Sequence, residues 1–147
     1  AATGAIAGLA AVTPASGFIG PIGGLGIGIA SGLICFWAAT SLKRKFGYDD
    51  SLDVVGVHGV GGLVGTLLAA VFAAEMFGGI KGGDYSIASQ FKVQAGAALI
   101  TTIYTLLASY VVLKVVDATI GLRVTEQEEL SGLDLALHNE VGYNMNE

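Results

Sequence analysis

Three long stretches of this chain contain no Asp, Glu, Lys or Arg. They cover residues 1–42, 54–74 and 93–113. A helix that crosses a hydrocarbon core of roughly 30 Å needs about 20 apolar residues, so each of the two later stretches fits one crossing. In a bilayer the backbone must satisfy its own hydrogen bonds, and these stretches lack the alternating pattern of barrel strands. The sequence therefore predicts an all-α, polytopic transmembrane helix bundle.

Composition supports a membrane protein and excludes several other classes. Only 13% of the residues are charged, about half of the roughly 25% typical of soluble domains, and the mean hydropathy is +0.70. The single cysteine, Cys35, can form neither an internal disulfide nor a zinc site. The net charge of −5 leaves no basic surface for nucleic acid. We expect no metal, no cofactor and no nucleic-acid partner.

The first stretch is too long for one crossing, and Pro14 and Pro21 interrupt it. Proline removes a backbone donor and disfavours helix in the preceding residue. We expect a transmembrane region over residues 1–117 and a tail over residues 118–147. The expected helices cover about 1–15, 22–42, 54–74 and 93–117. The first of these is shorter than a full crossing and lacks the basic start of a signal peptide, so it is interpreted as the end of a longer helix.

The basic residues predict the orientation of the chain. The linker Lys43-Arg44-Lys45 and the tail side, with Lys114 and Arg123, carry five of the seven basic residues. Two crossings separate the linker from the tail, so both lie on the same side. The positive-inside rule makes that side cytoplasmic, and the glycine-rich loop at residues 78–83 then faces outward.

Glycines recur at spacings of four within the apolar stretches. Gly24, Gly28 and Gly32 form one such series, and Gly61 and Gly65 form another. Helices in lipid associate by close backbone packing, which small residues permit. We interpret these glycines as packing faces rather than as a phosphate-binding loop.

His58 is the one histidine within the expected crossings. Ionisable residues inside membranes are rare and mark pathways or bundle interiors, so His58 is the candidate functional residue. A neutral imidazole has one donor and one acceptor nitrogen and needs a second polar group to fix its tautomer. No other histidine and no acidic residue lies within the three uncharged stretches, so we expect this partner to come from a part of the protein outside this chain. Asp53 and the other acidic residues just before this helix are expected to cap its N-terminus.

The acidic tail carries a helix-start signal. Thr125 and Glu128 have capping-box spacing, and Ser131-Gly132 is expected to end the short helix that follows. Two interpretations stay open: a solvated tail, or a folded cytoplasmic segment that docks against the membrane or a partner.

Three segments resemble one known family. Residues 49–66, DDSLDVVGVHGVGGLVGT, strongly resemble the signature of the ammonium transporter family (Amt/Mep/Rh). Residues 4–15, GAIAGLAAVTPA, are similar to its eighth helix, and residues 121–143 are similar to the cytoplasmic tail of the Amt branch. The three segments occur in the family's order and together cover nearly the whole chain.

The resemblance implies a fold and an activity. Family members have eleven transmembrane helices and form trimers with one pore per subunit, and this chain would be the C-terminal part: helices eight to eleven plus the tail. His58 would be the second of the family's twin histidines, and Val54 would line the pore. The other histidine would come from helices outside this chain. The implied function is ammonium or ammonia transport for nitrogen uptake across the plasma or inner membrane.

The resemblance also implies a regulatory tail that contacts a PII-family signalling protein. Its candidate residues are Arg123, Glu128, Asp134, His138, Glu140 and Tyr143. Asn139 stands where the family usually has glycine between histidine and glutamate, and Asn is the next most tolerant residue for a left-handed turn.

Two other function classes compete with transport. One is a non-conducting structural fragment of such a transporter, unable to transport alone. The other is a membrane enzyme, which the spans disfavour because they hold no nucleophile with an adjacent base and no paired carboxylates.

Overall fold

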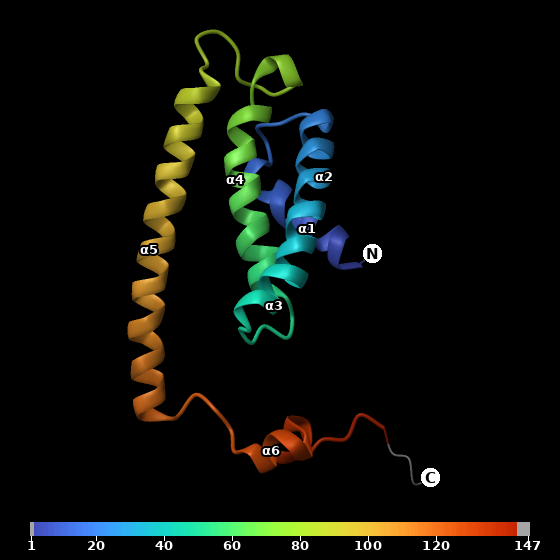
Figure 1. The fold of residues 1–147 in the computed structure, drawn as a ribbon, viewed down its shortest axis with the longest axis vertical. Coiled ribbons are helices and arrows are strands. Elements are labelled where there is room, and N and C mark those ends of the chain that lie inside the picture. Colours follow the sequence, from blue (N-terminus) through green and yellow to red (C-terminus); the bar gives the residue numbers. More distant parts are fainter. Residues whose placement is uncertain (1, 144–147) are drawn as a thin grey trace. The chain divides into compact units, whose positions relative to one another are not determined.

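The computed structural model describes residues 2–143, and that part of the chain is helical apart from turns and one isolated bridge between Ala74 and Lys81. Three helical segments are long and apolar enough to cross a membrane: Pro21–Phe46, Val55–Phe72 and Ile87–Thr119. The predicted all-α transmembrane bundle is therefore confirmed (Figure 1). The chain divides into two units after Thr102, inside the last long helix.

The first helix is shorter than a crossing. Helix α1 covers Ala2–Val12 and continues into a 3₁₀ turn, Thr13–Ala15. Within the described residues these two elements span the range in which a helix was expected, about 1–15. The Thr13 hydroxyl donates to the Leu9 carbonyl at 2.8 Å, and Pro14 sits in the turn where the helix ends.

The next crossing is longer than the predicted range 22–42. Helix α2, Pro21–Trp37, begins with its proline in the first turn, where the missing N–H has no helical partner to lose. A π turn, η2 at Ala38–Leu42, and a short helix, α3 at Lys43–Phe46, carry the rod into the basic linker. It ends at Gly47, whose φ of 63° is left-handed, a conformation that glycine adopts without steric cost.

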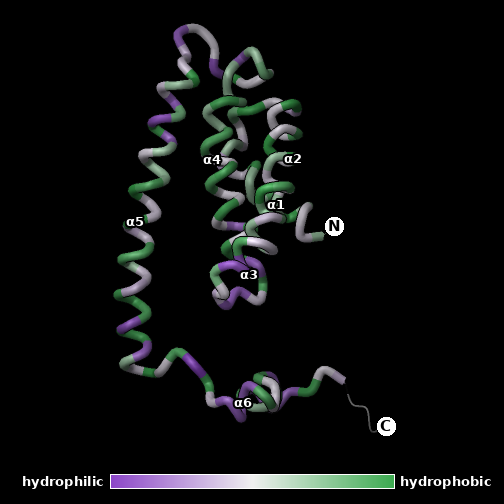
Figure 2. The backbone as a smooth tube through the Cα atoms, in the orientation of Figure 1, coloured by the Kyte–Doolittle hydropathy of each residue, from purple (hydrophilic) through white to green (hydrophobic). Residues whose placement is uncertain are grey.

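The following crossing again combines a π turn with an α-helix. The π turn η3, Val55–Gly59, precedes helix α4, Val60–Phe72. A 3₁₀ turn at Glu75–Phe77 leads to helix α5, Ile87–Thr119. Helix α5 begins before the predicted residue 93, because polar residues such as Lys92 extend its helical hydrogen bonding beyond the apolar run. Figure 2 shows apolar residues along α2 and α4 and polar residues clustered near α3.

Helices α1, α2 and α4 pack against one another through small side chains. One cluster of buried residues holds Ala11, Ala15, Ile27 and Ala69. The predicted packing roles of Gly61 and Gly65 are confirmed: a Cβ on Gly61 would lie 3.3 Å from the Cys35 sulfur, and one on Gly65 would overlap the Ala11 backbone.

The glycine series on α2 is less enclosed. A Cβ on Gly24, Gly28 or Gly32 would meet no described atom within 4 Å. Only Gly28 has a close backbone neighbour, because a Cβ on Gly8 would lie 3.8 Å from its α-carbon. For Gly24 and Gly32 the packing role stays a prediction.

The second unit contains the tail. Helix α6 covers Glu126–Ser131 and begins with the predicted capping box between Thr125 and Glu128. Gly132, at φ 90°, ends it as predicted. A further π turn, η5 at Asp134–His138, packs against α6 and is closed by Asn139.

Candidate functional site

His58 lies in the π turn η3 at the start of an apolar crossing. Its side chain is exposed, and within the described residues the imidazole has no hydrogen-bond or ion-pair partner. Val54, just before the same turn, is 49% exposed. The structure thus places the two predicted pore residues on parts of one crossing that the other helices of the first unit leave open.

A small cavity borders the imidazole. It has a volume of about 200 Å³. Its walls come from the start of α1, from the linker before η3 and from η3 itself: Thr3, Ile6, Ser51, Leu52, Asp53, Val57 and His58. His58 therefore faces a recess rather than a close-packed core.

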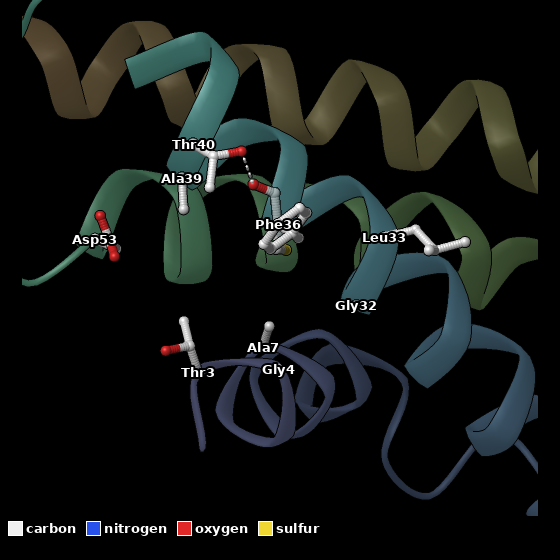
Figure 3. A pocket seen from close by; sticks show the side chains of 10 residues that line it. Thr3, Gly4, Ala7, Gly32, Leu33, Phe36, Ala39, Thr40 and Asp53 are labelled. Carbon is white, nitrogen blue, oxygen red and sulfur yellow. Dashed lines mark hydrogen bonds between the residues drawn. The ribbon is translucent and has the colours of Figure 1, made fainter. Parts of the chain in front are cut away.

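A second cavity, of about 360 Å³, lies between α1 and the end of the α2 rod. Figure 3 shows Thr3 and Ala7 on one side of it, with Phe36, Ala39 and Thr40 opposite. Its walls are mostly apolar. Thr3 and Asp53 line this cavity as well as the one beside His58, so the two cavities are neighbours that share these two lining residues.

The side-chain cap of the His58-bearing helix is Asp50. Its carboxylate oxygens accept hydrogen bonds from the backbone N–H groups of Val54 and Val55, both at 2.8 Å. Capping was expected of Asp53 and of the other acidic residues before this helix, and the described contacts show it for Asp50. The Asp53 carboxylate pairs with Lys43 at 2.8 Å, and the Asp53 backbone is left-handed, with a φ of 54°.

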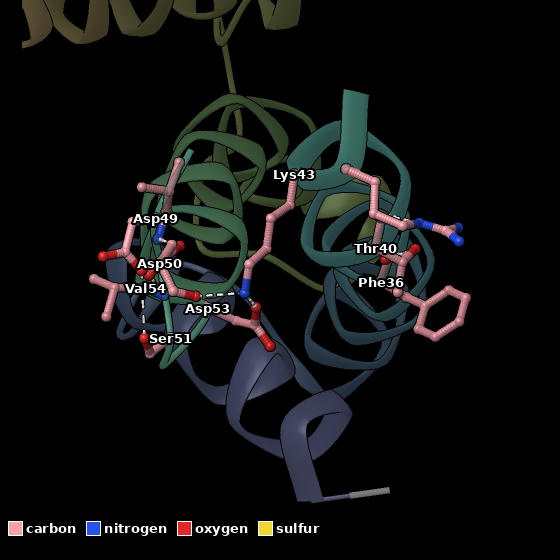
Figure 4. Close-up of polar contacts among 10 residues, drawn as sticks. Phe36, Thr40, Lys43, Asp49, Asp50, Ser51, Asp53 and Val54 are labelled. Atoms are coloured by element: carbon pink, nitrogen blue, oxygen red, sulfur yellow. Dashed lines mark hydrogen bonds and ion pairs between the residues drawn. The ribbon is translucent and has the colours of Figure 1, made fainter. Parts of the chain in front are cut away.

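Lys43 lies before the chain reversal at Gly47, and its side chain contacts residues that follow the reversal. Its ammonium group donates to the Asp53 carboxylate and to the Asp50 carbonyl oxygen (Figure 4). Sequence reasoning did not identify Lys43 as part of the site. Its position among three consecutive basic residues indicated only membrane topology.

The π turn is held from behind by close packing. A Cβ on Gly56 would lie 2.9 Å from the Ala39 nitrogen, so η3 and η2 approach at backbone distance. Val57 is only 4% exposed, and its carbonyl oxygen accepts a long contact of 3.9 Å from the Cys35 thiol. One face of η3 is therefore fixed, while His58 lies on the open face.

No group of three or more His, Cys, Asp or Glu side chains within residues 2–143 is arranged to hold a metal ion. Among these residues the site offers one imidazole, one ion pair and several hydroxyls. Such a set can orient or pass a small polar solute.

The predicted tail residues lie around α6 and η5. The Glu128 carboxylate accepts from the Thr125 backbone at 2.8 Å and from its hydroxyl at 2.7 Å. These hydrogen bonds from Thr125, the side-chain one first, lower the pKa of Glu128 below its ordinary value of 4.5. Glu128 is thereby fixed as part of a helix cap.

The remaining tail residues are solvent-facing or joined through the backbone. The Glu140 N–H donates to the Asp134 carbonyl at 3.1 Å, and His138 ends the π turn. Arg123 lies between α5 and α6, and Tyr143 is 85% exposed. All of these residues belong to the second unit, whereas His58 belongs to the first.

An apolar, multi-span helical chain with an open intramembrane histidine is typical of a membrane transporter or channel. Comparison with known proteins identifies the particular class. The model of the Ammonium Transporter Family matches residues 1–143. The chain belongs to the ammonium transporter family, whose named members are transporters rather than enzymes.

Relatives from distant organisms agree with the family match. The chain is 44% identical to an ammonium transporter of Bacillus subtilis and 43% identical to one of Aquifex aeolicus, with 97% of the chain covered in both alignments. It is 42% identical, over 96% of its length, to the ammonium transporter Amt1 of Archaeoglobus fulgidus. These alignments cover 36%, 34% and 36% of the three relatives. The chain thus spans about a third of their length.

Proposed function

We propose that this chain contributes the His58 side of a pathway that carries ammonium or ammonia across a membrane. The observation that carries the proposal is the position of His58. Its imidazole has no hydrogen-bond or ion-pair partner among the described residues. It lies on the open face of a membrane-spanning helix, beside a cavity. The family and the names of the relatives supply the solute.

The chemistry of the solute fits an imidazole in an apolar passage. Removing the ammonium ion from water is costly, whereas neutral ammonia loses little on entering an apolar channel. A neutral imidazole can accept a hydrogen bond at one nitrogen and donate one at the other. His58 then either holds the neutral solute or relays its proton.

In this proposal, helices that this chain does not contain form the opposite wall of the pathway. The exposed faces of His58 and Val54 support this arrangement, as does the threefold greater length of the relatives. A second histidine of a twin pair would lie there. The complete protein would be a trimer in the plasma or inner membrane, with one pathway per subunit, and would serve nitrogen uptake.

The orientation follows from the basic residues. The linker that holds Lys43 and the tail that holds Arg123 lie on the cytoplasmic side in this proposal. The loop around Gly79 lies on the outer side. The transmembrane region then covers residues 1–117, and residues 118–147 form the cytoplasmic tail.

The alternative is a non-conducting fragment that packs as a bundle but transports nothing alone. This alternative is favoured by the length of the chain, which spans only about a third of the relatives. Ammonium-evoked current from this chain alone, compared with the full-length protein that contains it, separates the two functions.

The pore role is tested by His58→Ala and His58→Leu in the full-length protein, reconstituted in liposomes. We expect ammonium-evoked current to fall at least tenfold while the amount of inserted protein stays unchanged. Leu99→Ala is the matched control, because Leu99 is 61% exposed on α5 and lines neither cavity. Undiminished current in both His58 variants would refute the pore role.

The tail is proposed to be a contact surface for a PII-family regulator, through Arg123, Glu128, Asp134, His138, Glu140 and Tyr143. Binding of a cognate PII protein to the intact transporter is compared with binding to a variant truncated after Arg123. Loss of binding supports the proposal, and equal binding overturns it.

A further inference from the structure

Two π turns face each other at the cytoplasmic end proposed above. The turn η2 ends the α2 rod, and η3 begins the next crossing and carries His58. They meet at Ala39 and Gly56, where a Cβ on Gly56 would lie 2.9 Å from the Ala39 nitrogen and 3.0 Å from its α-carbon. Each turn therefore restricts the backbone of the other.

A single side chain ties the outer ends of the two turns together. Lys43 directly follows η2, and Asp53 lies two residues before η3. The Lys43 ammonium nitrogen lies 2.8 Å from an Asp53 carboxylate oxygen, and their side chains are only 28% and 33% exposed. A partly buried pair is screened less by solvent and salt than a surface pair.

The same ammonium group also fixes the cap of the helix. It donates to the Asp50 carbonyl, while the Asp50 carboxylate accepts from the N–H groups of Val54 and Val55. Figure 4 shows Lys43 reaching from its helix toward Asp50 and Asp53. Lys43 thus contacts Asp50, whose carboxylate caps the His58-bearing helix, and Asp53, whose carbonyl accepts a hydrogen bond from Val57 in that helix.

Asp53 combines this contact with an unfavourable backbone conformation. Its φ of 54° is left-handed, which a residue with a side chain adopts at a cost and only when its surroundings hold it there. The Asp53 carbonyl accepts from the Val57 N–H at 2.8 Å, so a change at Asp53 is passed directly to the turn that carries His58.

The orientation of the imidazole depends on the π turn. In η3 the Val60 N–H donates to the Val55 carbonyl, five residues back, instead of four. A π turn adds one residue to the helix, and one residue corresponds to about 100° of rotation. A return to α-helical hydrogen bonding would turn His58 relative to the rest of α4.

We propose that Lys43, through Asp53 and the two facing π turns, is a positioning residue that sets the orientation of the His58 imidazole. The expected effect on transport rests on the proposed pore role of His58. The expected effect on the orientation of the imidazole does not depend on that role. Lys43 acts without touching the solute.

The test uses the full-length protein with Lys43→Met, Lys43→Arg and the matched control Lys45→Met. Lys45 belongs to the same short helix, and its ammonium group lies 5.9 Å from the centre of the Phe46 ring. Among the described residues the ion pair to Asp53 comes from Lys43. Two quantities are measured in liposomes: ammonium-evoked current across pH, and the ¹⁵N signals of the His58 imidazole, identified by their absence in His58→Ala.

We expect Lys43→Met to lower the current at least tenfold, to displace its pH profile and to shift the His58 imidazole signals. Lys43→Arg should restore both readouts, because a guanidinium group can still pair with Asp53, and Lys45→Met should behave as the native protein. If Lys43→Met does not insert, Asp53→Asn replaces it, since this change removes the charge and keeps the shape.

Unchanged imidazole signals in Lys43→Met or Asp53→Asn overturn the positioning role, whatever the current does. Shifted signals together with full current in His58→Ala support the positioning and refute the pore role instead. The failure of this inference and the failure of the proposed function are therefore distinguishable.

Discussion

Gly65 of α4 lies directly against the backbone of Ala11 in α1. A Cβ placed on Gly65 would be 2.7 Å from the Ala11 carbonyl carbon and 3.0 Å from its α-carbon. Real Cβ atoms essentially never approach other atoms closer than 3.0 Å. Because the obstacle is backbone rather than a flexible side chain, the two helices can approach this closely only with glycine at position 65.

Gly65→Ala is therefore expected to destabilise the full-length protein by about 1–3 kcal/mol, the usual cost of overpacking. The measurement is the midpoint of thermal unfolding in detergent. Gly62→Ala is the matched control on the same helix, because a Cβ there would meet no described atom within 4 Å. An unchanged midpoint for Gly65→Ala would contradict the close packing of α1 and α4.

The Asp50 cap gives a second prediction. Asp50→Ala removes the acceptors of the Val54 and Val55 N–H groups, and loss of a helix cap costs about 0.5–2 kcal/mol. We expect faster amide hydrogen exchange across η3, measured by mass spectrometry on peptides that cover residues 52–60.

Ser51→Ala is the control for the Asp50 substitution. The Ser51 hydroxyl makes only an exposed contact of 3.4 Å to Asp49, so its removal should leave exchange in η3 unchanged. Equal exchange in the native protein and in Asp50→Ala would mean that another group caps the helix.

Hydropathy located the crossings but not their ends. The apolar runs predicted every membrane-spanning helix, because apolar length is what a bilayer requires. Helix α2 nevertheless runs into α3, and α5 begins at Ile87, since helical hydrogen bonding continues through Lys43 and Lys92. The capping box at Thr125 was predicted accurately because its signal is local.

The site was predicted only in part, for a physical reason. His58 stands out because ionisable residues are rare in apolar runs. The π turn that holds His58 is only five residues long, which is too short to show a periodic pattern of apolar residues in the sequence. The Lys43–Asp53 pair depends on a chain reversal at Gly47, and sequence alone does not show which of several nearby carboxylates the reversal brings to Lys43. Hence Asp50 rather than Asp53 caps the helix.

The capping box in the tail should depend on pH. Thr125 holds the pKa of Glu128 below 4.5 by donating to its ionised carboxylate. A carboxyl group whose pKa is lowered by folding stabilises the folded form above its unfolded pKa, and this stabilisation is lost as pH falls through the folded pKa. We therefore expect the cap to be intact at neutral pH and to weaken as the pH falls below 4.5, the ordinary pKa of a Glu side chain.

The measurement is the amide chemical shift of Thr125 as pH falls, because its N–H donates to the Glu128 carboxylate. The midpoint should lie below 4.5 in the native protein. In Thr125→Val, which removes the hydroxyl donor, it should rise. Glu128→Gln should show no such titration, and a native midpoint at or above 4.5 would contradict the lowered pKa.

Asn139 should tolerate glycine but not a side chain that disfavours the left-handed region. Its φ is 51°, and it closes η5 by donating its N–H to the Leu135 carbonyl at 3.1 Å, next to the Glu140–Asp134 backbone bond of the same length. Left-handed backbone costs about 1–2 kcal/mol for most residues, whereas glycine adopts it freely and Asn is tolerant.

Asn139→Gly should therefore keep slow hydrogen exchange at the amides of residues 139 and 140. Asn139→Val should speed exchange there, because a β-branched residue fits this conformation worst. The amides of α6 serve as an internal reference, since their cap at Thr125 does not involve Asn139. Equal protection in the Gly and Val variants would show that the turn does not depend on left-handed backbone at position 139.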